Sequence, residues 1–114
     1  MGGLTTHVLD TAQGKPGCGI PLTLHRIDKT KELLVSTVTN SDGRTDTPLL
    51  DEHTHKPGTY ELTFRVGDYF KSAKAVHDGG FLDNITLRFT LIDDTHYHVP
   101  LLVSPWSYST YRGS

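Results

Sequence analysis

The sequence predicts an all-β protein in which two antiparallel sheets pack face to face as a β-sandwich. Two observations lead to this fold class. Apolar and polar residues alternate with a period of two in several short segments, and clusters of Gly, Pro, Asn and Asp separate these segments. One stretch with a helical period interrupts the alternation. We therefore expect about eight short strands and one short α-helix in a single domain covering residues 1–114.

The first half of the chain contains four of the predicted strands. In the clearest of them, Ile20, Leu22 and Leu24 alternate with Pro, Thr and His, as in a strand with one buried face. Turn-forming clusters at 14–17 and 40–43 separate the segments. The four predicted strands cover residues 4–10, 20–25, 32–39 and 44–49.

The second half of the chain contains the other four predicted strands. Here the alternation is strongest, because Tyr60, Leu62, Phe64 and Val66 line one face and polar residues line the other. The same pattern recurs over 85–91. The four predicted strands cover residues 59–66, 85–91, 97–104 and 107–112.

The short helix is predicted over residues 68–77. Asp68 is a residue type that favours the N-cap position, and a glycine follows the predicted end. Tyr69, Ala73 and Val76 recur on one face. We interpret this apolar stripe as core packing.

Composition and charge exclude several classes of function. The net charge is −2 and the basic residues are scattered, so the chain lacks the basic patch of a nucleic-acid-binding protein. No apolar run is long enough to span a membrane. The only cysteine, Cys18, excludes an intrachain disulfide, and no apolar signal segment follows Met1. We expect a cytoplasmic protein whose modest core, with 35% hydrophobic residues, favours an oligomer.

Four basic side chains are candidates for chemistry. His96 and His98 are two residues apart on a predicted strand, so they point to the same face. His7 lies in the middle of the first strand, on the face that Thr5 also occupies. Arg44 follows an Asp-Gly turn signal and begins a predicted strand. Each of these positions taken singly is more often a half-exposed polar residue than a catalyst.

The histidines also suggest an alternative, because a His-x-His pair commonly provides two metal ligands. A zinc site would combine His96, His98 and His7. No further thiol, carboxylate or histidine follows at ligand spacing, so we expect no metal and no cofactor. The other histidines fall in loops or on polar faces, and we expect solvent exposure for His25, His53, His55 and His77.

The last residues of the sequence are unusually rich in functional groups. Tyr108, Tyr111 and Ser114 bring phenol and hydroxyl groups to a position where chains usually fray, so we expect a docked tail. An unperturbed phenol titrates near ~10, which favours packing or binding over acid catalysis for the tyrosines.

Three blocks of the chain, residues 4–12, 39–44 and 96–114, together resemble the 5-hydroxyisourate hydrolases, a transthyretin-related family of urate breakdown. The resemblance implies a transthyretin-like β-sandwich of two four-stranded sheets with one short α-helix. It also implies a homotetramer, a dimer of dimers, with active sites in a central channel to which the tail contributes. Neither nucleic acid nor membrane is expected as a partner.

The resemblance also implies the site and the reaction. His7, Arg44 and His98 match the catalytic residues of the family, and the substrate-binding set adds Tyr111 and Ser114. The implied reaction is attack of water on a cyclic amide carbonyl of 5-hydroxyisourate, giving 2-oxo-4-hydroxy-4-carboxy-5-ureidoimidazoline. Either histidine could be the general base. The alternative is a non-catalytic carrier of the transthyretin type, which shares the fold but lacks the two histidines, the arginine and the Tyr-Arg-Gly-Ser ending.

Overall fold

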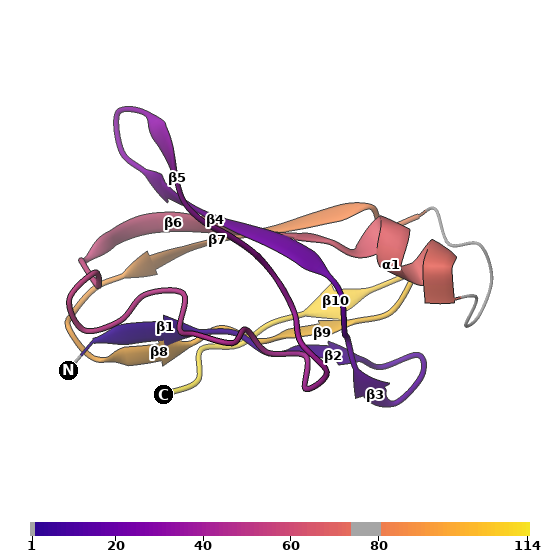
Figure 1. The fold of residues 1–114 in the computed structure, drawn as a ribbon. Helices are drawn as coiled ribbons and strands as arrows, with labels where there is room; N and C mark the ends of the chain where they lie inside the picture. The colour runs from indigo at the N-terminus through magenta and orange to yellow at the C-terminus, as the bar shows by residue number, and fades with distance from the viewer. Residues whose placement is uncertain (1, 74–80) are drawn as a thin grey trace.

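The computed structural model describes residues 2–73 and 81–114, which form two facing sheets with one helix at an end of the molecule (Figure 1). Each sheet has four strands, in the orders β5-β4-β6-β7 and β10-β9-β2-β3, and β1 and β8 form a further pair. The predicted fold class is confirmed. The elements are β1 Gly3–Thr5, β2 Val8–Asp10, β3 Lys15–Pro16, β4 Pro21–Ile27, β5 Lys31–Val38, β6 Gly58–Arg65, α1 Val66–Ala73, β7 Asn84–Leu91, β8 His96–His98, β9 Leu101–Val103 and β10 Tyr108–Ser109.

The sheet β5-β4-β6-β7 follows the sequence pattern closely and is antiparallel throughout. Tyr60, Leu62 and Phe64 of β6 are buried, and the residues between them are half-buried. Alternate residues of a strand face opposite sides, so a strictly alternating segment has one face for the core. The predicted strands 59–66 and 85–91 are confirmed, with small shifts at their ends.

The other sheet departs from the antiparallel prediction. Strand β1 pairs with β8, and β2 pairs with β9, in parallel. Parallel neighbours need a long crossover, and here the whole of the first sheet lies between them in the sequence. Thr5 lies opposite His98, and Val8 lies opposite Leu101, so both pairs share one register. They form a single interrupted ladder that runs along the lower layer of Figure 1.

Both partners in this ladder are interrupted at the same level. The predicted strand 4–10 is divided at residues 6 and 7, and the predicted strand 97–104 is divided at residues 99 and 100. Pro100 has no N–H group to donate, and the Thr6 hydroxyl donates to the Val99 carbonyl at 2.7 Å. The interruption leaves His7 between two strands.

The prediction of a strand over 44–49 is wrong, because this segment is an irregular loop. The Asn40 side-chain oxygen accepts hydrogen bonds from the N–H groups of Asp42 and Arg44, at 2.9 and 3.2 Å. The Thr45 hydroxyl donates to the Thr47 carbonyl at 2.6 Å. Such local side-chain bonds compete with the pairing that a strand would need.

Other boundaries also differ from the predictions. The helix begins at Val66, so Asp68 lies in its first turn and is not the N-cap. Residues 74–77 of the predicted helix and the glycine predicted to follow its end lie outside the described residues. Within the predicted strand 107–112 only Tyr108–Ser109 is a strand, and the two-residue strand β3 lies where a turn was predicted.

The core lies between the two sheets. Leu4, Val8 and Leu101 enter it from the interrupted ladder, and Leu24 and Phe64 enter it from the facing sheet, each without exposed surface. Burial of this apolar surface provides the main driving force for the fold. In the part of the chain that the structure describes, no helix combines the length and apolar character that a membrane span requires.

Candidate active site

His98 is held on three sides at the end of β8. Its backbone N–H donates to the Gly113 carbonyl at 3.0 Å, and its carbonyl accepts from the Gly113 N–H at 2.7 Å. Its ring Nδ1 lies 2.9 Å from the Thr5 hydroxyl oxygen on the neighbouring strand β1. One ring nitrogen is therefore engaged within the protein, and among the described residues nothing bonds Nε2, which can bind a water or a ligand. The orientation of the ring is fixed by this contact.

His7 is placed by the interruption of the ladder between β1 and β2. Its carbonyl accepts a hydrogen bond from the Leu101 N–H at 2.9 Å, which anchors the backbone although the residue lies outside both strands. The side chain is half-buried. The next residue, Val8, donates its N–H to the Gly43 carbonyl at 2.7 Å. This bond attaches the turn before Arg44 to the strand that follows His7.

Gly43 allows this close attachment. Its φ is +74°, in the left-handed region that favours glycine. A Cβ atom at this position would collide with the Val8 carbonyl oxygen. The Asp-Gly turn of the sequence is therefore confirmed as a turn, and its glycine has a packing reason as well as a conformational one.

The loop after Gly43 extends back along the same strand. Leu49 and Leu50 bond the backbone of Leu4, at distances of 2.8 to 3.3 Å. The loop thus begins against Val8 and ends against Leu4, so it passes over the residues between them. A cavity of about 180 Å³ lies there, lined by Thr5, Thr6, Arg44, Thr45, Asp46, Thr47 and Pro48. Arg44 therefore lies at the cavity that the His98 partner Thr5 also lines.

Electrostatics link the three predicted catalytic residues. Burial lowers the pKa of His7 below its ordinary value of 6.5, and the charge of Arg44 lowers it further, against a smaller raising effect of Asp42. Burial also lowers the pKa of His98, followed by the effects of Arg44, His7 and His96. Both imidazoles are consequently neutral at neutral pH. Arg44 thus influences the pKa of both His7 and His98, although the three residues are far apart in the sequence.

His96 takes part in this site only at its edge. It is half-buried on β8 opposite Gly3, and its charge contributes least to the lowered pKa of His98. Within residues 2–73 and 81–114, no three His, Cys, Asp or Glu side chains are grouped so that they could hold a metal ion. The geometry gives the zinc alternative no support.

The tail residues separate into two locations. Ser114 follows Gly113, whose backbone pairs with His98, so Ser114 lies beside the histidine site and is exposed. Tyr111 is exposed and lines a different cavity, of about 480 Å³, together with residues of β7 and the tail. Neither His7 nor His98 lines that cavity. Within this one chain, Tyr111 therefore does not join the predicted site.

The expectation that His55 is solvated is wrong. It is 7% exposed, its Nδ1 accepts a hydrogen bond from the Gly3 N–H, and its Nε2 lies 2.9 Å from the Asp93 carbonyl oxygen. Its ring stacks on Tyr97. Of the other three, His53 is exposed and His25 is half-buried, while His77 lies outside the described residues.

Sequence reasoning missed Thr5 as a residue that orients His98. The available signal was its place on the same strand face as His7, but a threonine in a strand is common and needs no functional reason. Its importance appears only when β1 is paired with β8.

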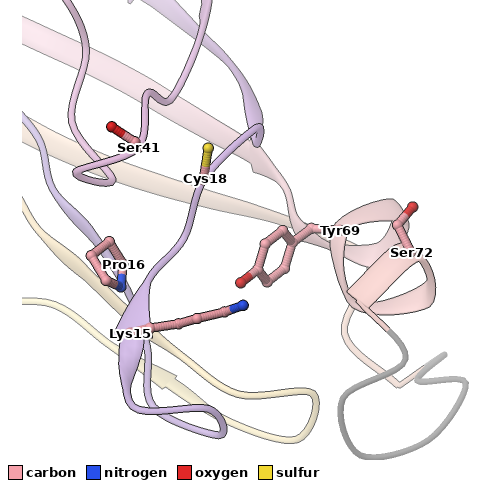
Figure 2. Close-up of a pocket in the computed structure, with 6 residues that line it drawn as sticks. All are labelled: Lys15, Pro16, Cys18, Ser41, Tyr69 and Ser72. Carbon is pink, nitrogen blue, oxygen red and sulfur yellow. The ribbon is translucent and has the colours of Figure 1, made fainter.

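Figure 2 shows the residues that line another cavity. Its volume is about 400 Å³, and no histidine is among its lining residues. Its lining includes Lys15, Cys18 and Tyr69, with the cysteine exposed. The Tyr69 hydroxyl donates to the buried Asp10 carboxylate at 2.7 Å, and burial and this bond raise the pKa of the phenol. Tyr69 also packs against the core, as the helical stripe predicted, whereas the side chains of Ala73 and Val76 in the same stripe lie outside what the structure describes. None of the predicted catalytic residues lines this cavity.

Comparison with known proteins gives one consistent result. Residues 4–113 match the family described as HIUase/Transthyretin. A protein of Deinococcus radiodurans named 5-hydroxyisourate hydrolase is 60% identical, over 98% of this chain and 96% of its own length. The solved structure of Klebsiella pneumoniae 5-hydroxyisourate hydrolase is 34% identical with a TM-score of 0.81, over 98% of this chain and 99% of that one.

A structure titled (S)-allantoin synthase is also similar, with a TM-score of 0.92 and 49% identity. The match covers 99% of this chain but only 44% of that one, so the similar part is one portion of a longer protein. The match to the family covers nearly the whole sequence, and the identities are high. The chain belongs to the HIUase/Transthyretin family.

Proposed function

We propose that this chain hydrolyses 5-hydroxyisourate to 2-oxo-4-hydroxy-4-carboxy-5-ureidoimidazoline, a step of urate and purine breakdown. The observation that carries the proposal is that Arg44 lines a cavity with Thr5, whose hydroxyl contacts the His98 ring, while burial and the Arg44 charge lower the pKa of both His7 and His98. The relative from Deinococcus radiodurans that is named for this activity supports the choice of substrate.

The histidines supply the proton transfers. Water is a poor nucleophile, and a neutral imidazole can take its proton as it attacks the amide carbonyl carbon. The C–N bond then breaks and the leaving nitrogen takes up a proton. When the Thr5 hydroxyl accepts from Nδ1–H of His98, the free Nε2 carries a lone pair and can act as the base. When the same hydroxyl donates, Nε2 carries the proton and can act as the acid. His7 takes the complementary role.

Arg44 supplies the positive charge. Its planar set of donors can pair two carbonyl oxygens of the substrate and stabilise the negative charge that develops on the attacked oxygen. The same charge lowers the pKa of both histidines, which keeps them neutral and able to exchange protons near pH 7. Tyr111 and Ser114 complete the proposed binding set, with Ser114 beside His98.

The proposed assembly is a homotetramer, arranged as a dimer of dimers. Exposed apolar and aromatic side chains support association, since Tyr108, Tyr111 and Trp106 are all about half exposed or more. A tetramer would also bring a second copy near Tyr111, which stands apart from the histidines within one chain. Light scattering after size exclusion tests this, with an expected mass of four times the 12.6 kDa of one chain.

The proposed location is the cytoplasm. The free thiol of Cys18 is exposed, which suits a reducing compartment. Fractionation of the native cells, followed by detection of the chain, tests this proposal.

The direct test of the function follows the absorbance of freshly generated 5-hydroxyisourate with and without the protein. Decay that accelerates in proportion to protein concentration is expected. Decay at the rate in buffer, combined with tight binding in a thyroid-hormone titration, would instead favour the transthyretin-type carrier.

A further inference from the structure

Several contacts attach the tail to the sandwich, since β10 pairs with β9, the Thr110 hydroxyl donates to the Pro100 carbonyl at 2.6 Å, and Gly113 pairs with His98. A further side-chain attachment comes from Arg112, which directly precedes Gly113. Its guanidinium carbon lies 4.3 Å from the centre of the Tyr97 ring. Its Nη2 also donates to the Thr95 hydroxyl at 3.1 Å and to the His96 carbonyl at 3.4 Å. An arginine over an aromatic face gains cation–π attraction, and its several N–H donors can at the same time bond polar groups beside the ring.

The ring below Arg112 is itself fixed. The Tyr97 hydroxyl donates to the Asp93 carboxylate at 3.1 Å and accepts from the Ile92 N–H at 3.2 Å. His55 stacks on the same ring, with 6.2 Å between ring centres. The Tyr97 residue is 6% exposed. Arg112 therefore rests on a rigid platform and not on a mobile side chain.

The next residue along the tail reaches the histidine site. Gly113 makes the two backbone hydrogen bonds to His98, and a Cβ atom on it would lie only 3.1 Å from the Cβ of His98. Tyr97 and His98 are adjacent on β8, so Arg112 contacts the ring on one face while Gly113 pairs along the strand edge. Last residues fray unless they are held, and two backbone bonds are a weak hold.

We propose that Arg112 is a positioning residue that acts through Tyr97 to hold Gly113 and Ser114 against His98. The effect on catalysis rests on the proposed function, because the tail matters to turnover only if His98 takes part in it. The role differs from that of Arg44, which lines the cavity beside Thr5 and is proposed to bind the substrate directly.

The test compares Arg112→Ala, Arg112→Lys and the control Arg65→Ala. Arg65 is also exposed and directly precedes α1, and within the described residues it forms an ion pair with Asp68 at 3.4 Å. We expect Arg112→Ala to lower kcat/KM about tenfold, mainly through kcat, and Arg112→Lys to lower it less, because lysine keeps the charge on the ring. Arg65→Ala is expected to match the wild type within about twofold.

A second arm removes residues 113 and 114, alone and together with Arg112→Ala. If Arg112 acts through the tail, its substitution lowers kcat/KM no further in the shortened chain. Equal fold losses in the full and shortened chains would overturn the proposal, as would wild-type activity of Arg112→Ala.

A third arm needs no substrate. Amide hydrogen exchange at Gly113, followed by NMR, should be at least about tenfold faster in Arg112→Ala than in the wild type or Arg65→Ala. Unchanged exchange would overturn the positioning role even if activity fell. Absence of hydrolysis by the wild type, with faster Gly113 exchange in the variant, would refute the proposed function and leave the attachment of the tail standing.

Discussion

Thr5→Val tests how the site orients His98. The substitution keeps the branched shape of the side chain and removes the hydroxyl that lies 2.9 Å from Nδ1 of the ring. A single hydrogen bond of this kind contributes about 0.5–1.5 kcal/mol net. If the bond is needed at full strength in the transition state, its loss lowers kcat/KM by about 2- to 13-fold, since 1.4 kcal/mol is a factor of ten.

The assay is steady-state kinetics on freshly generated 5-hydroxyisourate, with Thr5→Ser as the matched control. Serine keeps the hydroxyl and loses only a methyl group, so its kcat should remain close to that of the wild type. The loss in Thr5→Val should appear in kcat more than in KM, because the bond sets the tautomer and orientation of a proton-transfer group and does not bind substrate. Equal activities of Thr5→Val and the wild type, or equal losses in the valine and serine variants, would refute this reasoning.

Three further predictions concern charge, backbone and metal. Arg44→Ala should raise the pKa of both His7 and His98 in NMR titrations, and unshifted pKa values would contradict the assignment. Because the pKa values of both histidines are lowered in the folded state, the wild type should also lose free energy of unfolding as the pH falls from about 6.5. Gly43→Ala should lower the free energy of unfolding in urea by at least about 2 kcal/mol, because of its φ of +74° and the collision with the Val8 carbonyl; wild-type stability would refute this. Chelator treatment should leave turnover unchanged, whereas a loss that zinc restores would favour the zinc alternative.

Much of the fold could be predicted from alternation alone. Strand β6 is predictable from the sequence, since Tyr60, Leu62 and Phe64 face the core and their neighbours do not. The alternation of apolar and polar residues does not show whether a strand pairs in parallel or antiparallel. Nothing within the segment 4–10 shows that its partner is parallel and 93 residues away, because parallel pairing depends on the path of the rest of the chain.

The failures at the loop and at His55 have local and tertiary causes. The segment 44–49 contains two threonines and a leucine, which suit a strand, but Asn40 and Thr45 satisfy part of its backbone through side chains. His55 looks like a loop residue in the sequence, and it is buried because Gly3 and the Asp93 carbonyl supply partners for both ring nitrogens. A buried polar residue of this kind is predictable only once its partners are placed.

The candidate site was recognised through a resemblance, and its residues are too dispersed to be found by spacing. The resemblance names His7, Arg44 and His98, and the structure explains how they meet, through the interrupted ladder and the loop attached to Val8. The structure of one chain does not account for Tyr111, which lines a separate cavity.

The central claim is that the imidazoles beside Arg44 carry out the hydrolysis, and His98→Asn tests it most directly. Asparagine can still reach the Thr5 hydroxyl and keep the backbone pairing with Gly113, but it cannot exchange a proton as an imidazole does. The measurement is kcat/KM for 5-hydroxyisourate, with thermal unfolding as the check on folding. A loss of about 100-fold or more in a variant of unchanged stability is the predicted result. Turnover equal to that of the wild type would contradict the claim.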